Sequence, residues 1–157
     1  MASFFFYGTL LDPDVRRLVL GRELEPTSLH AATLANHRVS RARGKTYPVL
    51  ASKRGAKAHG LIATHLNDRD AARLFHYEDD GYATIEVELS VFDDRMTAWA
   101  FMPGPRMKAL PVDWSYAAWR RSVKARVMPG IAAWMAAYPG PDALPHYRRW
   151  RLRRHAA

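Results

Sequence analysis

Two short stretches of the chain hold residue types that could bind and transform a small molecule. In the first, residues 7–10 (Tyr-Gly-Thr-Leu) end a run of aromatic residues and are followed at once by Asp12-Pro13. Asp and Pro are typical of the first positions of a helix, so a strand would end here beside a helix N-terminus. Backbone N–H groups at such a corner can bind an anion, and glycine lets a ligand approach the main chain. A tight turn after a buried strand is the alternative interpretation.

The second stretch is the acidic run Glu78-Asp79-Asp80, which we place at the C-terminal end of a helix. The helix dipole is negative at that end, and crowded carboxylates raise one another's pKa. Beside the apolar side chains of Phe75 and Tyr77, such an acid could transfer protons as a general acid or base. Taken alone, however, each of the two stretches is more simply explained as a turn.

Other kinds of chemistry find no support in the sequence. The chain has no cysteine, which excludes disulfides, thiolate zinc sites and cysteine nucleophiles. It has no phosphate-binding glycine motif and no nucleophile elbow. Its seven histidines are scattered without metal-ligand spacing. We therefore predict neither a metal nor a cofactor.

The N-terminal segment does not resemble a targeting signal. It has no basic region before its short apolar run, and no small-residue cleavage site follows. No stretch approaches the roughly 20 apolar residues that a membrane span requires. We expect a cytoplasmic protein that does not contact membranes.

The two stretches must be positioned by a run of strands with few helices between them. Helices are expected from Pro13 to Gly21 and from Asn67 or Asp68 to the acidic run. In the clearest strand, 84–91, four apolar residues alternate with polar ones. We predict an α+β fold with a mostly antiparallel or mixed sheet that can curl into a small barrel. The expected strands span 3–8, 29–39, 47–50, 59–66, 84–91 and 96–102.

The C-terminal third is expected to be helical and is strongly basic. We expect Asp113 to cap a helix whose apolar stripe is Tyr116, Trp119, Val123 and Val127, with a kink or break at Pro129-Gly130. Residues 1–109 carry fifteen Lys/Arg and thirteen Asp/Glu, whereas residues 110–157 carry nine and two. Such an excess can bind nucleic acid or an acidic partner. Arginines around Trp150 could contact phosphates while the indole stacks on a base. A solvated, partly disordered tail is the alternative.

The sequence resembles the γ-glutamylcyclotransferase-like family, which includes the AIG2-like proteins. Tyr7-Gly8-Thr9-Leu10 matches the family's Tyr-Gly-Ser/Thr-Leu loop, and Tyr47-Pro48-Val49-Leu50 matches a Tyr-Pro-x-Leu element. A Gly-containing strand matches at Gly60-Leu61-Ile62, and the family's Glu, short turn and Tyr match at Glu78 to Tyr82. The order and spacing agree over residues 3–104. Each motif is weak alone, and the ordered set is fairly specific.

The resemblance implies a small barrel-like α+β fold with a cavity, and the helical C-terminal extension lies outside the matched region. It also implies a cofactor-independent enzyme that converts a γ-glutamyl amine or peptide to 5-oxoproline and a free amine. Glu78 would be the catalytic proton-transfer residue, and the other site residues would bind the small-molecule γ-glutamyl substrate. These are Tyr7, Gly8, Thr9, Leu10, Tyr47 and Tyr82.

Two positions depart from the family pattern and leave the substrate open. The family often has an Arg two residues after the turn Tyr, where this chain has Thr84, and a Tyr on the late strand, where it has Phe101. A non-catalytic member of the fold, acting through its basic C-terminal third, is therefore the second hypothesis. We expect one domain over 1–157, made of a core over 3–104 and a basic extension over 105–157. The leaving amine and the oligomeric state stay open.

Overall fold

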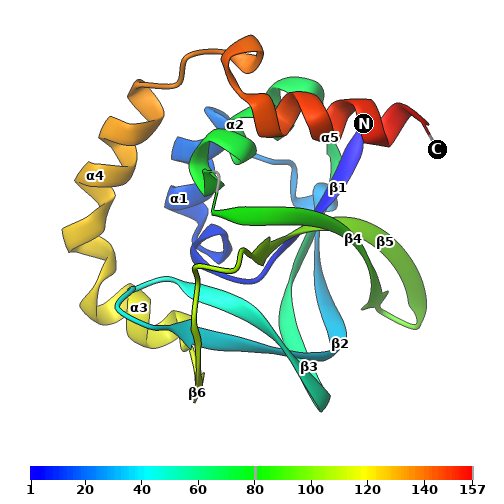
Figure 1. The fold of residues 1–157 in the computed structure, drawn as a ribbon, viewed down its shortest axis with the longest axis vertical. Helices are drawn as coiled ribbons and strands as arrows, with labels where there is room; N and C mark the ends of the chain where they lie inside the picture. Colours follow the sequence, from blue (N-terminus) through cyan, green and yellow to red (C-terminus); the bar gives the residue numbers. More distant parts are fainter. Residues whose placement is uncertain (80, 157) are drawn as a thin grey trace.

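The computed structural model describes residues 1–79 and 81–156 and has an α+β architecture (Figure 1). The strands are β1 (Ala2–Phe6), β2 (Leu29–Ala42), β3 (Pro48–Leu66), β4 (Tyr82–Val91), β5 (Asp94–Pro103) and β6 (Ala109–Asp113). The α-helices are α1 (Pro13–Leu20), α2 (Asp68–Glu78), α3 (Tyr116–Ser122), α4 (Lys124–Ala136) and α5 (Pro145–Ala156). Short 3₁₀ turns are η1 (Thr9–Leu11), η2 (Pro26–Ser28) and η3 (Pro141–Ala143).

The strands form a mixed sheet that closes into a barrel. Their order is β3-β1-β5-β4-β2, and an additional β2–β3 pairing joins the two ends, while β6 extends the sheet beyond β2. The β1–β5 pairing is parallel and the others are antiparallel. The predicted α+β barrel with flanking helices is therefore confirmed.

The first strand is buried on both faces, which explains why its sequence does not alternate. Phe5 points into the barrel, whereas Phe4 and Phe6 pack against the helices outside it. The partner strand β3 approaches closely at Gly60, where an added Cβ would lie 2.2 Å from the Phe6 carbonyl oxygen. The helices cover this outer side of the barrel, with α4 along the left edge of Figure 1 and α5 at the top.

The predicted starts of α1 and α2 are confirmed. Asp12 caps α1 by accepting from the N–H groups of Asp14 and Val15, and Gly21 ends it in the left-handed conformation. Asn67 and Asp70 form a capping box at the start of α2. These caps fix the two helices that flank the acidic run and the 7–10 loop.

The expected strands 47–50 and 59–66 are one strand in the structure. β3 pairs with β2 from Leu29↔Ala63 to Arg41↔Pro48, with a register shift between Ala35 and His37. Around Gly55, between the two expected strands, β3 continues through this irregularity, where Asn36 Oδ1 accepts from the Gly55 N–H. The expected alternation of 84–91 also fails at its start, because Thr84 is buried and Ile85 is 40% exposed.

The C-terminal third differs most from expectation. Asp113 does not cap a helix, because it belongs to the unpredicted strand β6 and pairs across to Ser40. Ser115 caps α3 instead, accepting from the Ala118 N–H at 3.1 Å. The helix breaks at Val123, and Pro129 is accommodated inside α4. The tail is the helix α5, whose Trp150 is fully buried.

Two hydrophobic clusters stabilise the fold. The barrel interior holds one, which includes Ile62 and Leu89, and the space between barrel and helices holds the other. The outer cluster includes Trp119, Met135 and Trp150, so the C-terminal helices share a core with the barrel. In the described part of the chain, no helix is both long and apolar enough to cross a membrane.

Candidate functional site

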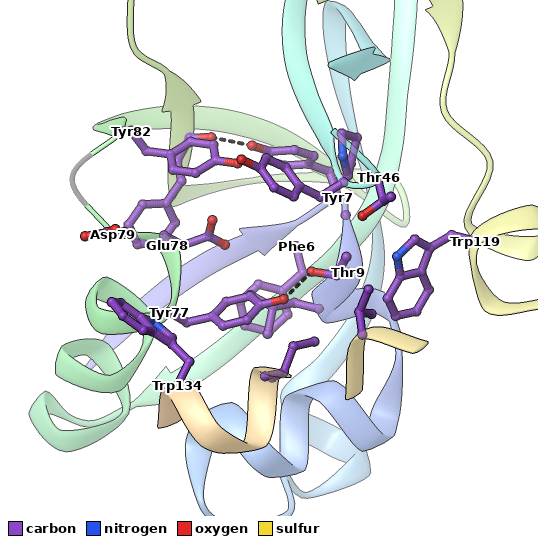
Figure 2. Close-up of a pocket in the computed structure, with 18 of the residues that line it drawn as sticks. Phe6, Tyr7, Thr9, Thr46, Tyr77, Glu78, Asp79, Tyr82, Trp119 and Trp134 are labelled. Carbon is purple, nitrogen blue, oxygen red and sulfur yellow. Dashed lines mark hydrogen bonds between the residues drawn. The ribbon is translucent and has the colours of Figure 1, made fainter. Parts of the chain in front are cut away.

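A cavity of about 610 Å³ opens beside the end of β1 (Figure 2). Its walls come from the 7–10 loop, the 46–48 segment, the end of α2, the start of β4 and helices α3 and α4. This volume is in the range of small-molecule sites. The cavity therefore brings the two stretches that the sequence singled out into one space.

Glu78 is the last residue of α2 and lies in the cavity wall. Its half-buried carboxyl is directed into the space between Tyr77, Tyr82 and Tyr7 (Figure 2). Burial raises the pKa of Glu78 to about 8. The neutral acid and its carboxylate are thus both accessible near neutral pH, as proton transfer in both directions requires.

Three tyrosines surround this carboxyl and are held neutral. The pKa values of Tyr7, Tyr77 and Tyr82 are all raised, first by burial and then by the negative charge of Glu78. Tyr7 donates its hydroxyl hydrogen to the Phe101 carbonyl oxygen at 2.5 Å. The site therefore offers hydroxyl groups and one acid, without a second strong base among these neighbours.

The 7–10 loop is shaped by contacts to its carbonyl groups and side chains. Arg16 Nη1 donates to the carbonyl oxygens of Leu10 and Leu11 at 2.9 and 2.8 Å. Within η1, Leu11 N–H donates to Gly8 and Asp12 N–H to Thr9. The N–H groups of Thr9 and Leu10 open the turn and so have no partner within it. Main-chain donors are thus present at the cavity wall, as the anion-binding interpretation requires.

Two close contacts fix the position of this loop against its neighbours. The hydroxyls of Thr9 and Tyr77 lie 2.6 Å apart, which links the loop to the turn of α2 that carries Glu78 (Figure 2). A Cβ added to Gly8 would lie 2.9 Å from Pro48 Cγ. The glycine therefore allows the Tyr-Gly-Thr-Leu and Tyr-Pro-x-Leu segments to pack directly on each other.

Asp12 ties the loop to the C-terminal helices. Its fully buried carboxylate accepts from Tyr116 at 2.9 Å and pairs with Lys124 at 3.0 Å. Burial alone would raise its pKa, but the hydrogen bonds from Lys124 and Tyr116 outweigh burial and lower the pKa of Asp12. Tyr116 and Lys124, the first residues of α3 and α4, thus hold Asp12 in place just after the 7–10 loop. The family resemblance predicts that this loop binds the glutamyl group.

The chain leaves α2 through a strained conformation. Asp79 caps the helix at φ 58° and ψ −169°, a region that favours glycine. Its N–H nevertheless donates to the Phe75 carbonyl oxygen at 3.1 Å. This geometry turns the chain sharply after Glu78, so that Tyr82 begins the next strand on the same cavity.

Every residue that the family resemblance assigned to the site lines this cavity. The set is Tyr7, Gly8, Thr9, Leu10, Tyr47, Glu78 and Tyr82. Their roles in binding and proton transfer stay predictions. Of the two departures, Phe101 lies in the wall, whereas Thr84 is buried and does not line the cavity.

Residues of the C-terminal segments also line the cavity, and the sequence did not predict them there. Trp119 comes from α3, and Val127, Ile131 and Trp134 come from α4. The last three have the spacing of one helix face, which was the available signal. The spacing of apolar residues along a helix, however, does not show which part of the protein that helix face will contact.

Among the lining residues that the structure describes, none is a cation, and the charged ones are Glu78 and Asp79, both acidic. The described residues also contain no group of three His, Cys, Asp or Glu placed to hold a metal ion. An anion in this cavity would therefore be bound by main-chain amides and by hydroxyls of the lining Thr and Tyr residues.

Some residues of the basic tail pack against the rest of the protein. Trp150 lies in the core, so the expected stacking of a base on this indole is wrong. Arg154 pairs with Asp68 at 2.7 Å, and Arg153 donates to the Thr84 carbonyl oxygen at 3.1 Å. Arg148 and Arg149 stay exposed.

Comparisons with known proteins show the family and the fold to which the chain is similar. The model of the family described as "Gamma-glutamyl cyclotransferase, AIG2-like" matches residues 4–121. Protein AIG2 C of Arabidopsis thaliana is 27% identical over 126 residues, which cover 75% of this chain and 72% of that protein. AIG2-like protein D of the same plant is 28% identical over 129 residues, covering 77% and 80%.

Solved structures share the fold. The solution structure of an Arabidopsis thaliana protein aligns with a TM-score of 0.61 at 24% identity and covers 89% of this chain and 94% of that chain. A gamma-glutamyl cyclotransferase structure aligns with a TM-score of 0.51 at 15% identity, covering 84% and 86%. At these identities, the likeness concerns the fold.

Proposed function

The chain belongs to the gamma-glutamyl cyclotransferase, AIG2-like family, and from this premise we propose that it cyclises a γ-glutamyl amine or peptide. The products would be 5-oxoproline and the free amine. The observation that carries the proposal is Glu78, an acid with a pKa of about 8 that faces the 7–10 loop across one cavity. The acid and the loop are the two parts that this chemistry needs.

The loop would hold the glutamyl head of the substrate. No Lys, Arg or His is among the described lining residues, so the α-carboxylate would be bound by main-chain N–H groups of Gly8 to Leu10. The α-ammonium would lie against Glu78, the nearest acid in the wall. This pose folds the substrate so that its own amine approaches the γ-carbonyl carbon, which exploits intramolecular proximity.

Glu78 would carry protons from the attacking nitrogen to the leaving nitrogen. The α-ammonium favours the carboxylate form of Glu78 because opposite charges stabilise each other. The ammonium first loses one proton to water through Glu78, which leaves the neutral amine and the carboxylate. The carboxylate takes a second proton as the amine nitrogen bonds to the γ-carbon and closes the five-membered lactam, and the acid delivers that proton to the leaving nitrogen as the original C–N bond breaks. The freed amine takes up a proton from water, so the two protons lost by the α-nitrogen are balanced.

The raised pKa suits this double role. A carboxylate whose acid has a pKa of about 8 is a stronger base than an ordinary glutamate, so it takes the ammonium proton at a lower free-energy cost. The carboxylate fraction in the free enzyme grows as pH rises through that value. We therefore expect kcat/KM to rise with pH and to level off above about 8.

The test is to incubate the protein with γ-L-glutamyl amides and to measure 5-oxoproline by chromatography. Glu78→Gln keeps the shape of the side chain and removes proton transfer, so we expect turnover to fall by about 10²–10⁴-fold. Glu86→Gln, which changes an exposed glutamate on β4 outside this cavity, is the matched control and should retain full turnover. Full turnover in Glu78→Gln would refute the assigned mechanism.

A further inference from the structure

One face of α4 forms a wall of the cavity opposite the barrel. Val127, Gly130, Ile131 and Trp134 line the cavity, and their spacing of i, i+3, i+4 and i+7 places them on one side of the helix. Trp119 of α3 extends this wall. The α4 residues lie beyond residue 121, where the family match ends. The α4 part of this wall therefore lies outside the region that the family model matches.

The α4 wall is fixed in place at both ends of the helix. At its C-terminal end, His76 and Trp134 are stacked with ring centroids 4.7 Å apart. Each ring also bonds to the other residue's carbonyl oxygen, at 2.8 Å from His76 Nε2 and 2.9 Å from Trp134 Nε1. At its N-terminal end, Lys124 pairs with Asp12 and Asp14. The wall is therefore a rigid part of the site.

The chemistry of this wall selects against charge. Its four α4 residues and Trp119 carry no charged group. A carboxylate on the amine portion would meet no cation among the described lining residues, and an unpaired charge in apolar surroundings is unfavourable. An ammonium group would face the same penalty against α4, although Glu78 and Asp79 lie elsewhere in the lining.

We propose that α4 binds the amine portion of the substrate and selects γ-glutamyl compounds whose amine portion is apolar and uncharged. Alkylamides and arylalkylamides of γ-glutamate belong to this class, whereas γ-glutamyl amino acids and polyamines do not. The inference rests on the proposed function, because it assigns the end of the cavity that the glutamyl head would leave free. The cavity volume of about 610 Å³ leaves room for an amine portion beside that head.

The first experiment compares turnover of four γ-L-glutamyl compounds by the wild-type protein. They are the benzylamide (apolar and large), the methylamide (small), the glycine conjugate (anionic) and the 1,4-diaminobutane conjugate (cationic). We expect kcat/KM for the benzylamide to exceed that of either charged compound by about tenfold or more. Equal or better turnover of the glycine or diaminobutane conjugate would overturn the inference while leaving the proposed function intact. Turnover of none of the four would overturn both.

The second experiment changes the wall without cutting into the core. A Cβ added at Gly130 meets no atom within 4 Å, and replacing a helical glycine does not weaken the helix. Gly130→Leu should lower kcat/KM for the benzylamide by about fivefold or more relative to kcat/KM for the methylamide. Gly130→Lys should shift the preference from the benzylamide toward the glycine conjugate, because it supplies the missing cation.

Ala133 provides the matched control. It is exposed on the same helix and does not line the cavity. Ala133→Leu and Ala133→Lys should leave the order of the four substrates unchanged. If the Gly130 and Ala133 variants changed selectivity alike, or if neither Gly130 variant changed it, α4 would not be the selecting wall.

Discussion

The barrel segment, residues 2–103, and the C-terminal segment, residues 109–156, contribute different kinds of side chain to the same cavity. From the barrel segment come the hydroxyls of Tyr7 and Tyr82, the acid Glu78 and the loop amides. From the C-terminal segment come Trp119 and the apolar face of α4. The barrel segment thus contributes the polar and acidic groups of the cavity, and the C-terminal helices contribute an apolar wall. On the proposed function, variants of the two segments should therefore alter proton transfer and substrate selectivity separately.

The C-terminal segment shares a hydrophobic core with the barrel segment. We therefore predict that it is essential for folding, although the family match ends at residue 121. Trp150 is fully buried and stacks near Phe4 and Phe75. Trp150→Ala should lower the free energy of unfolding by about 3–5 kcal/mol, measured by urea denaturation. A loss below about 1 kcal/mol would mean that α5 is an appendage.

Two further variants sharpen this measurement. The indole Nε1 of Trp150 has no hydrogen-bond partner among the described residues, so Trp150→Phe should cost less than about 1.5 kcal/mol. Leu152 is 74% exposed on the same helix, and Leu152→Ala should change stability by less than about 0.5 kcal/mol.

The link between the two segments gives the next largest effect. Asp12→Ala removes the α1 cap and leaves Lys124 without its buried partner, so we expect a loss of about 2–4 kcal/mol. Asp14 is half exposed and also pairs with Lys124, and Asp14→Ala should cost less than about 1 kcal/mol. Equal losses in the two variants would show that burial of Asp12 does not matter.

Acid titration tests the same link with a defined sign. The pKa of Asp12 is lowered from 3.8 in the folded state, so its contribution to stability is present above the unfolded value and is lost as pH falls through the folded value. The wild-type protein should therefore lose stability below pH 4 more steeply than Asp12→Asn does. Thermal unfolding at stepwise pH checks this difference.

Glu78 has the opposite linkage and gives a smaller effect. Its pKa rises from 4.5 to about 8 on folding, so the folded state binds more protons between these values and stability falls as pH rises across them. Because the residue keeps part of its solvent contact, Glu78→Gln should be more stable than wild type at pH 9 by roughly 1–3 kcal/mol. The two proteins should have similar stability at pH 4, where the acid is neutral in both states. This result would show that Glu78, the proposed catalytic group, lowers the stability of the fold, whereas other residues such as Asp12 and Trp150 raise it.

The exposed arginines of α5 should give the smallest effect. Arg148→Ala combined with Arg149→Ala should change the free energy of unfolding by less than about 0.5 kcal/mol and leave 5-oxoproline formation unchanged. The same variant tests the nucleic-acid hypothesis without disturbing Trp150. Salt-sensitive binding of a labelled oligonucleotide that disappears in this variant would assign a separate role to the tail.

Local patterns in the sequence predicted most helices and strands of the barrel segment, because caps, strand composition and hairpins have signatures within a few residues. The caps at Asp12 and Asn67, the unalternating strand β1 and the β4–β5 hairpin each have their own residue signature. The placement of Glu78 on the cavity also follows from its position at the end of α2.

The C-terminal segment could not be predicted in the same way, because long-range contacts determine it. Lys124 looks like an exposed base until Asp12 is found beside it, 112 positions earlier in the chain. Trp150 looks like a stacking platform until the core of the barrel segment covers it. The strand β6 is too short and interrupted by Pro111 to be recognised without its partner β2.

That same short strand has a consequence for how the protein behaves when concentrated. Closure of the barrel pairs β2 with β3 along most of their length, and in the described residues the sheet ends at β6. An open strand edge is a template on which another chain can pair and aggregate. Here the edge spans Ala109–Asp113, lacks one backbone donor at Pro111 and ends in a charged aspartate. Each of these features disfavours intermolecular strand pairing, so we expect this edge to resist the growth of fibrils.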